Sequence, residues 1–404
     1  MSATLSSRPG DAIAARGTGP VVTRDKGFGI SRAVCIREDK LKTHELLHPG
    51  PRAVGLWLLA VAGMILLMVV VGGLTRLTGS GLSIMVWDPI VGALPPLSGA
   101  EWQRVFHLYR QIPQYAHEHA GMTLAAFKGI FWWEWAHRLL GRLIGVAFFV
   151  PFLWFAWRGA IGRAAIPRMV ILFVLGGLQG FVGWWMVESG FENRDSVSQY
   201  RLAIHLGVAL ILFAAILWTA FEYLRPRPAR AAKPPRLANW ALALCGLIYA
   251  QMLLGSLVAG LHAGLVYNTW PDMDGMFFPE GAMFFTPWYV NFFDNAALAQ
   301  FDHRMVAYAV LIGACALWLA GRRARLSGMV RASADMMLLA AAAQVMLGIF
   351  TLINQVPIPL AAAHQAMAVI LFGTALWQAY ELRGTGALSP TDVGDAAPWQ
   401  GTAG

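Results

Sequence analysis

Four histidines lie inside strongly apolar stretches of this chain: His137, His205, His303 and His364. A histidine within a membrane-spanning segment is energetically costly and marks a functional site by default. One such residue could be a packing histidine bonded to a carbonyl, but four at matched positions are hard to explain in that way. Two imidazoles facing each other across a helix bundle can hold a haem iron from both sides. The order along the chain favours two ligand pairs, the first two histidines and the last two.

Zinc or copper fits these pairs less well, because two histidines without a third ligand underfill such sites. The three cysteines, Cys35, Cys245 and Cys315, form no CxxC or CxxCH motif. Neither covalent haem attachment nor a zinc ribbon is therefore supported. The segment His117-Glu118-His119 resembles part of an HExxH motif, but position 121 is Gly121. We interpret this segment as a solvated loop.

Glu134 is the candidate for acid–base or electrostatic chemistry. It precedes His137 by three residues, so the two side chains share one helix face. Gln300, which cannot ionise, holds the matched place before His303. This asymmetry predicts a reactive N-terminal half and a structural or electron-transferring C-terminal half. The alternative is that Glu134 simply lies at a wet helix end.

Three arginines are candidate partners for haem propionates. Arg138 and Arg304 each follow a ligand histidine, and Arg76 lies at the outer end of the first span. Snorkelling of long side chains to the membrane interface explains the same three residues equally well.

The elements that position these residues are predicted to be membrane helices. Hydrophobic residues make up 57% of the chain and charged residues 13%, and the mean hydropathy is +0.54. A soluble domain carries roughly a quarter charged residues. Apolar runs of about 20 residues, the length that crosses a bilayer, recur along the chain. We predict spans near residues 54–75, 136–157, 166–187, 200–222, 238–261, 299–320, 334–354 and 358–380.

The distribution of charge predicts the orientation. The net charge of +9 does not indicate nucleic acid, because the basic residues gather in the N-terminal tail and in alternate short connections between spans. The positive-inside rule places those segments in the cytoplasm. Both termini are then cytoplasmic, and the four histidines and the long connection 76–130 lie toward the outer face. We expect a multi-pass protein of a bacterial inner membrane, with a mitochondrial membrane as the alternative.

The chain contains an internal repeat. GGLTRLTGSGLSIMVW (72–87) aligns without gaps with GSLVAGLHAGLVYNTW (255–270), EWAHR (134–138) with QFDHR (300–304), and AIHLGVALILF (203–213) with AAHQAMAVILF (362–372). Gln179 and Gly183 of the third span match Gln344 and Gly348 of the seventh. This predicts an all-α membrane protein whose eight helices form two pseudo-symmetric four-helix bundles, related by an axis along the membrane normal.

The expected units follow from the repeat. They are a disordered tail (1–52), an N-terminal bundle (53–228), a C-terminal bundle (229–384) and a second disordered tail (385–404).

The segments GGLTRLTGSGLSIMVWDPIVGALPP, FWWEWAHRLLGRLIG and FDHRMVAY together resemble the haem A synthase family, over roughly residues 54–380. The long outer connection, ending MTLAAFKGIFWWEWAHR, is similar to the α-proteobacterial and mitochondrial subgroup. It lacks the cysteine pair of the Gram-positive type. The resemblance implies oxidation of a porphyrin methyl group of haem O to a formyl group, which gives haem A for cytochrome oxidase assembly.

Carried over by matched motif, the resemblance also implies residue roles. His137 and His205 bracket the substrate haem, Glu134 is catalytic, and His303 and His364 are the axial ligands of haem b. The implied partners are haem O synthase, an electron donor such as a ferredoxin-type protein, and the lipid bilayer. Association into a homo-oligomer is a further possibility. The alternatives are a two-haem electron carrier, which would need no Glu134, and a transporter, which would need broken helices with polar residues at mid-membrane.

Overall fold

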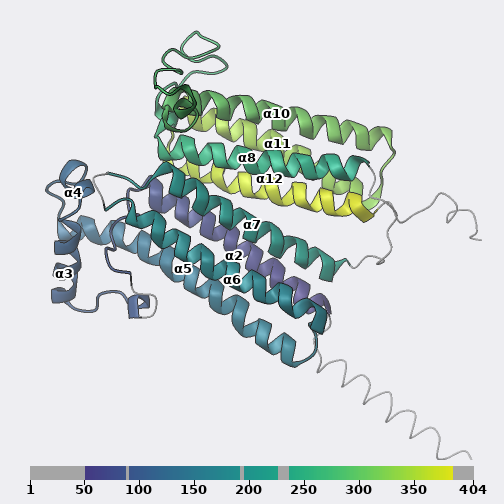
Figure 1. The fold of residues 1–404 in the computed structure, drawn as a ribbon, viewed down its shortest axis with the longest axis horizontal. Coiled ribbons are helices and arrows are strands. Elements are labelled where there is room, and N and C mark those ends of the chain that lie inside the picture. The colour runs from purple at the N-terminus through teal and green to yellow at the C-terminus, as the bar shows by residue number, and fades with distance from the viewer. Residues whose placement is uncertain (1–50, 88–90, 192–194, 226–235, 385–404) are drawn as a thin grey trace, which may run out of the picture. The chain divides into compact units, whose positions relative to one another are not determined.

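The computed structural model describes residues 51–87, 91–191, 195–225 and 236–384, so both predicted tails lie almost wholly outside it. All regular elements within these ranges are helical, and eight helices are long and apolar enough to cross a membrane. They are α2 (Pro51–Leu77), α5 (Leu124–Trp157), α6 (Ile166–Glu188), α7 (Gln199–Leu224), α8 (Arg236–Gly260), α10 (Ala296–Arg323), α11 (Gly328–Ile353) and α12 (Ile358–Gly384) (Figure 1). The all-α class with eight spans is confirmed.

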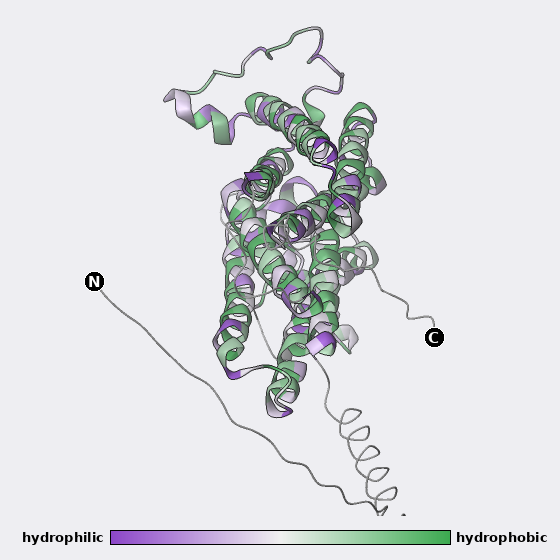
Figure 2. Cartoon of the chain, turned by 90° about the vertical axis from the view of Figure 1, so that its right-hand side faces the viewer, coloured by the Kyte–Doolittle hydropathy of each residue, from purple (hydrophilic) through white to green (hydrophobic). Residues whose placement is uncertain are grey.

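The helices are apolar on the sides that face away from the protein. On α5 the exposed residues include Leu143, Val146 and Val150, and on α6 they include Ile171 and Val174. Figure 2 shows hydrophobic residues along most of the helical surface. A helix that is hydrophobic all round needs apolar surroundings on every side. The chain is therefore a multi-pass membrane protein.

The eight helices form two groups of four with the same pattern of neighbours. In the first bundle, α2 and α6 each contact both α5 and α7. In the second bundle, α8 and α11 each contact both α10 and α12. The two groups correspond to the two halves of the sequence repeat. The symmetry axis between them stays a prediction.

The bundles meet where α7 contacts α8 and where α2 contacts α12. Gln365 of α12 donates its Nε2 to the Val69 carbonyl of α2 at 2.9 Å. Its side-chain amide occupies the space that a Cβ at Gly73 would need. Buried residues of both bundles, such as Leu210 and Val369, belong to one continuous apolar core. The two halves are thus joined by close packing.

The connection between α2 and α5, which is predicted to face the outside, folds into a small helical layer. It contains α3 (Gly99–Tyr109), whose first turn is capped by the Ser98 hydroxyl, and α4 (Pro113–His117). This layer packs on the N-terminal part of α5 through a separate cluster of buried side chains. The cluster comprises Leu82, Trp102, Phe106, Tyr109, Ile112, Phe127 and Phe131.

This packing explains why α5 begins well before the predicted span, which starts at 136. The helix begins at Leu124, and the Thr123 hydroxyl accepts the Ala126 N–H at 3.2 Å as its cap. His137 therefore lies well inside α5, and the predicted span of 136–157, which would place it in the first turn, is wrong at this end. The other three membrane histidines lie near the starts of α7, α10 and α12, as predicted.

Candidate functional site

Each of the four membrane imidazoles lies against a glycine of the preceding long helix. The pairs are Gly72 with His137, Gly183 with His205, Gly255 with His303, and Gly348 with His364. A Cβ added at any of these glycines would come within 2.8 to 3.1 Å of an imidazole atom. The sequence repeat matched these glycines to one another without assigning them a role. The structure shows that they make room for the imidazoles.

The structure brings each predicted histidine pair together. The ring centroids of His303 and His364 are 6.4 Å apart, with the ring planes at 78°. Two metal–nitrogen bonds of about 2 Å, with the ring centres beyond the nitrogens, correspond to a centroid separation of about 6 Å. His137 and His205 are near enough to interact electrostatically. Two-histidine pairs therefore fit the site, and no cluster of three His, Cys, Asp or Glu side chains occurs in the described ranges.

Glutamines of neighbouring helices reach three of the imidazoles. Gln251 of α8 donates its Nε2 to the His303 carbonyl at 2.8 Å, and the same nitrogen lies 3.1 Å from Nδ1 of that histidine. Gln179 of α6 holds His205 in the same way, at 3.0 and 3.1 Å. Gln344 of α11 has its Nε2 3.4 Å from the imidazole of the α12 histidine. Sequence reasoning missed Gln251, although a polar residue inside an apolar span is a usable signal.

The side-chain oxygen of each of these three glutamines is available for a further hydrogen bond. Oε1 of all three glutamines is buried and has no hydrogen-bond partner among the residues that the structure covers. A metal-bound histidine donates its second ring N–H to an acceptor of this kind. In the first half, Met68 takes the place of Gln251. No side-chain hydrogen bond joins His137 to another described residue, so this imidazole is held by packing alone.

Glu134 is only 2% exposed, which contradicts the alternative of a wet helix end. Its Oε2 accepts hydrogen bonds from the Ser83 hydroxyl and the Ile84 N–H, both at 2.8 Å. Its Oε1 accepts from Arg138, at 3.0 Å from Nε and 2.5 Å from Nη2. Every contact is a donor, and an ionised carboxylate accepts on both oxygens. Glu134 thereby ties α5 to the segment that leaves α2.

Arg138 is bound to the same segment. Besides its ion pair with Glu134, it donates to the Ile84 carbonyl at 2.7 Å and to the Val86 carbonyl at 3.2 Å. This predicted propionate partner therefore already has three partners within the protein. Together with Glu134 it fixes the first residues after α2 in place.

The second bundle repeats this arrangement with a neutral amide. Arg304 donates to the carbonyls of Tyr267 and Thr269, both at 3.0 Å, which are the matched positions of the repeat. Gln300 donates its Nε2 to the Tyr267 carbonyl at 3.0 Å, whereas Glu134 accepts from the matched backbone N–H. The exchange of carboxylate for amide reverses the direction of one hydrogen bond. It leaves a negative charge at this position in the first bundle only.

Arg76, the third candidate arginine, makes no hydrogen bond or ion pair with any described residue. It lies one turn beyond Gly72 on α2, and so shares the helix face that meets His137. The matched residue of the second half is Ala259. A cation at this place is thus a feature of the first bundle alone.

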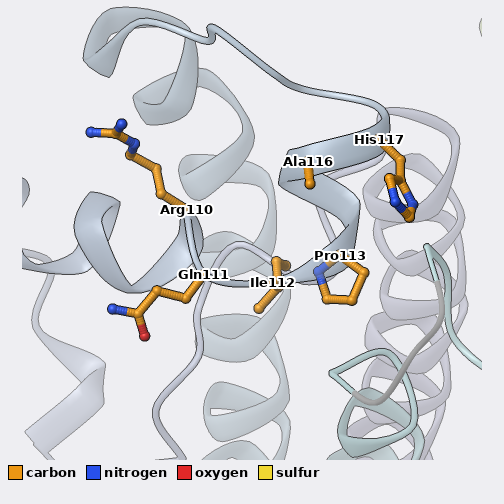
Figure 3. A pocket seen from close by; sticks show the side chains of 6 residues that line it. All are labelled: Arg110, Gln111, Ile112, Pro113, Ala116 and His117. Atoms are coloured by element: carbon orange, nitrogen blue, oxygen red, sulfur yellow. The ribbon is translucent and has the colours of Figure 1, made fainter.

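The histidines of the first outer connection have structural partners. His119 Nδ1 lies 2.5 Å from the Tyr109 hydroxyl, and burial of this tyrosine raises its pKa. His117 pairs with Asp195 at 2.6 Å and lines an open surface pocket beside Arg110 (Figure 3). The pocket contains none of the predicted site residues. The membrane histidines are therefore the candidate functional site.

Comparison with known proteins places the chain in a family. Residues 55–376 match the family described as cytochrome oxidase assembly protein. The chain is 51% identical to the heme A synthase of Parvibaculum lavamentivorans over 343 residues, which cover 85% of this chain and 98% of that protein. The chain belongs to the haem A synthase family. It is also 52% identical to the heme A synthase of Rhodopseudomonas palustris strain TIE-1 over 81% of this chain and 88% of that protein. For the Nitrosospira multiformis heme A synthase the identity is 47%, over 82% and 94%.

The part of the chain that matches the family begins in α2 and ends in α12. It includes the four membrane histidines and Glu134. The resemblance to haem A synthases drawn from the sequence motifs is thereby confirmed.

Proposed function

We propose that this chain oxidises a porphyrin methyl group of haem O to the formyl group of haem A, for use in cytochrome oxidase assembly. The observation that carries the proposal is a sequence identity of about 50% with proteins named heme A synthase, over more than four fifths of the chain. The family match over residues 55–376 supports it. The site geometry supports a division of roles between the two bundles.

The second bundle would hold a resident haem b between His303 and His364. When bound, haem b supplies one-electron transfer. Gln251 and Gln344 support this assignment, because each places its side-chain amide against the ring of a proposed ligand histidine, and neighbouring groups of this kind orient a metal-bound imidazole. Gln300 carries no charge, which suits a bundle that transfers electrons and does not make or break covalent bonds.

The first bundle binds the substrate haem O between His137 and His205. Met68 leaves His137 without the amide that holds His303, so the substrate ligand is less rigidly oriented than the cofactor ligand. This difference suits a haem that enters as substrate and leaves as product. The neighbouring Gly72 and Gly183 keep space for the two imidazoles.

Glu134 acts on the reacting methyl group. Conversion of the methyl group to the formyl group is a four-electron oxidation that adds one oxygen atom, with the net balance R–CH3 + H2O → R–CHO + 4 H⁺ + 4 e⁻, and positive charge develops at the methyl carbon as the electrons leave to the external redox partner. A preorganised carboxylate in a water-poor site stabilises such charge. Ser83 and Ile84 orient the carboxylate through their hydrogen bonds. Arg138 is a positioning residue, because it acts through Glu134.

Arg76 is the arginine that binds a propionate of the substrate haem. Arg138 and Arg304 donate to backbone carbonyls, whereas the Arg76 guanidinium has no described hydrogen-bond partner, and Arg76 lies one turn beyond the glycine beside His137. A guanidinium forms charge-assisted hydrogen bonds to a carboxylate in a fork geometry. Arg138 and Arg304 are then anchors of the outer connections, with any propionate contact secondary.

The dimethyl ester of haem O, whose propionates carry no charge, tests this role. We expect Arg76→Ala to weaken haem O binding about 10- to 100-fold, because a hydrogen bond to a charged group contributes about 1.5–3 kcal/mol. Binding of the ester, followed by the same absorbance titration, should not change. Equal losses for both ligands would show that Arg76 is structural.

The described arginines support the predicted orientation. Arg158 and Arg163 lie between α5 and α6, and Arg322 and Arg323 lie in the last turn of α10, at the same end of the bundles, whereas the four histidines lie toward the other end. We therefore place both termini in the cytoplasm of a bacterium and the haem sites near the outer face of its inner membrane. The proposed partners are haem O synthase, as the source of substrate, and a ferredoxin-type redox protein that exchanges electrons with the second bundle.

Expression in a host that makes haem O but lacks haem A tests the function directly. Chromatography of the extracted haems should show haem A only when the wild-type chain is present. Recovery of haem B alone with the purified protein would favour the two-haem electron carrier. Absence of haem A from host cells that contain the folded protein would overturn the proposal.

A further inference from the structure

The connection between α8 and α10 exposes aromatic side chains and buries polar ones, the reverse of a loop in water. We call residues 276–293 of this connection the aromatic loop. Its rings lie on the outside, with exposed fractions from 37% to 78%. The exposed aromatic residues are Phe277, Phe278, Phe284, Phe285, Trp288, Tyr289, Phe292 and Phe293. Water alone does not account for so many exposed rings in one ordered segment.

Asparagines hold the loop from within. Asn291, which is fully buried, accepts the Phe285 N–H at 2.8 Å and donates to the carbonyls of Phe285 and Trp288 at 2.8 and 2.9 Å. Asn295 donates to the Gly281 carbonyl at 2.6 Å and caps α10. These bonds satisfy the Phe285 N–H and the carbonyls of Gly281, Phe285 and Trp288 within the loop. Pairing of this kind lowers the cost of placing backbone groups in apolar surroundings.

The aromatic loop lies beside the membrane helices. The rings of Phe277 and Phe278 are 5.8 and 5.1 Å from that of Phe301, and Phe293 is 6.3 Å from Tyr200 of α7. Phe301 is five residues into α10, which is about 7 Å along a helix axis. In Figure 1 the loop projects sideways from the start of α10, and Figure 2 shows the same projection from a second side. The exposed rings therefore continue the apolar surface of the spans.

Charge argues against a partner that is recognised electrostatically. Glu280 is the single charged residue among positions 276–293, and that segment contains no Lys or Arg. Aromatic side chains, by contrast, gather where a bilayer meets water. Trp288 and Tyr289 each combine a large ring with a polar atom, which suits that boundary.

We propose that the aromatic loop lies in the outer interface of the bilayer, with its rings among lipid headgroups and upper acyl chains beside α10. The loop then acts as a lateral anchor that fixes the depth of the second bundle in the membrane. The proposal concerns a lipid surface and holds independently of the reaction assigned to the histidines.

Spin labels on introduced cysteines test the proposal in the full-length protein, in nanodiscs of zwitterionic phosphatidylcholine. Cys35, Cys245 and Cys315 are first replaced by serine or alanine. Labels at Phe284→Cys and Trp288→Cys should show several-fold greater accessibility to oxygen, and lower accessibility to a water-soluble nickel complex, than a label at Gln103→Cys. Gln103 is the matched control, because it is exposed on α3 of the other outer connection.

Helicity and elution volume confirm that each labelled variant is folded, and Met283→Cys, at a site 50% exposed, replaces any variant that is not. Nickel accessibility equal to that at position 103 would overturn the proposal and leave the rings free for a protein partner. Low accessibility to both reagents, with dipolar broadening between labels, would overturn it in favour of contact between two copies of the chain.

Discussion

The two bundles hold their histidines by the same means and differ in the groups around them. In both, an imidazole lies against a glycine, and an arginine after one histidine fixes the segment that leaves the first helix. Glu134 in the first bundle is replaced by Gln300 in the second, and Met68 by Gln251. A common scaffold thus carries a carboxyl side chain and one imidazole without an amide partner in the first half, and amides at both of these places in the second half.

Removal of one histidine from each bundle gives the largest expected effect. His303→Ala should abolish bound haem b, whereas His137→Ala should retain it and lose only the substrate haem. The haem types per protein, measured as pyridine haemochromes after extraction, distinguish the two. The reverse pattern would exchange the roles of the bundles.

Glu134→Gln isolates the charge difference between the halves. We expect haem A formation to fall about 10²- to 10⁴-fold, the range for a group that handles protons or charge in a reaction. Haem content should stay unchanged, which a spectrum of the purified protein checks. Gln300→Ala is the control at the matched position and should leave the rate within a small factor of wild type. A wild-type rate in Glu134→Gln would remove this residue from the chemistry.

Gln251→Met gives the second bundle the residue of the first. Loss of a group that orients a metal-bound histidine typically weakens binding about 10- to 100-fold. Haem b should therefore dissociate more readily, and its midpoint potential should shift. The reciprocal Met68→Gln should tighten substrate haem binding and slow its release. Unchanged potential and affinity in Gln251→Met would mean that packing alone orients His303.

The glycine contacts are expected to give the smallest effects. A Cβ at Gly183 would lie 2.8 Å from the His205 imidazole, whereas one at Gly180 of the same helix would meet nothing within 4 Å. Gly183→Ala should lower the affinity for haem O by about 1–3 kcal/mol, the usual cost of overpacking. Gly180→Ala should leave it unchanged and raise helix stability by roughly 1 kcal/mol. Equal affinities for the two variants would show that the imidazole adapts freely.

The sequence was sufficient for features that depend on local pattern. Long apolar runs locate the eight helices, and the repeat locates the four histidines. The replacement of Glu134 by Gln300 is likewise visible when the two halves of the sequence are aligned. These signals are strong because hydrophobic length and repeat position do not require knowledge of distant contacts.

Contacts between distant segments could not be predicted. Arg138 was considered for a propionate, but its partners Ile84 and Val86 lie about fifty residues earlier in the chain. The early start of α5 depends on packing between Phe127 and the separate helix α3. No local pattern shows such pairings, because they arise only when the connection folds back on the helix.

Gln365, the residue after His364, reaches across to the Val69 carbonyl where Gly73 has no side chain. The close approach of α2 and α12 at this point therefore depends on the absence of one methyl group. Electron tunnelling slows steeply as two centres move apart. For the proposed pair of haems, one in each bundle, a glycine between the bundles thus helps to keep the two electron-transfer partners close.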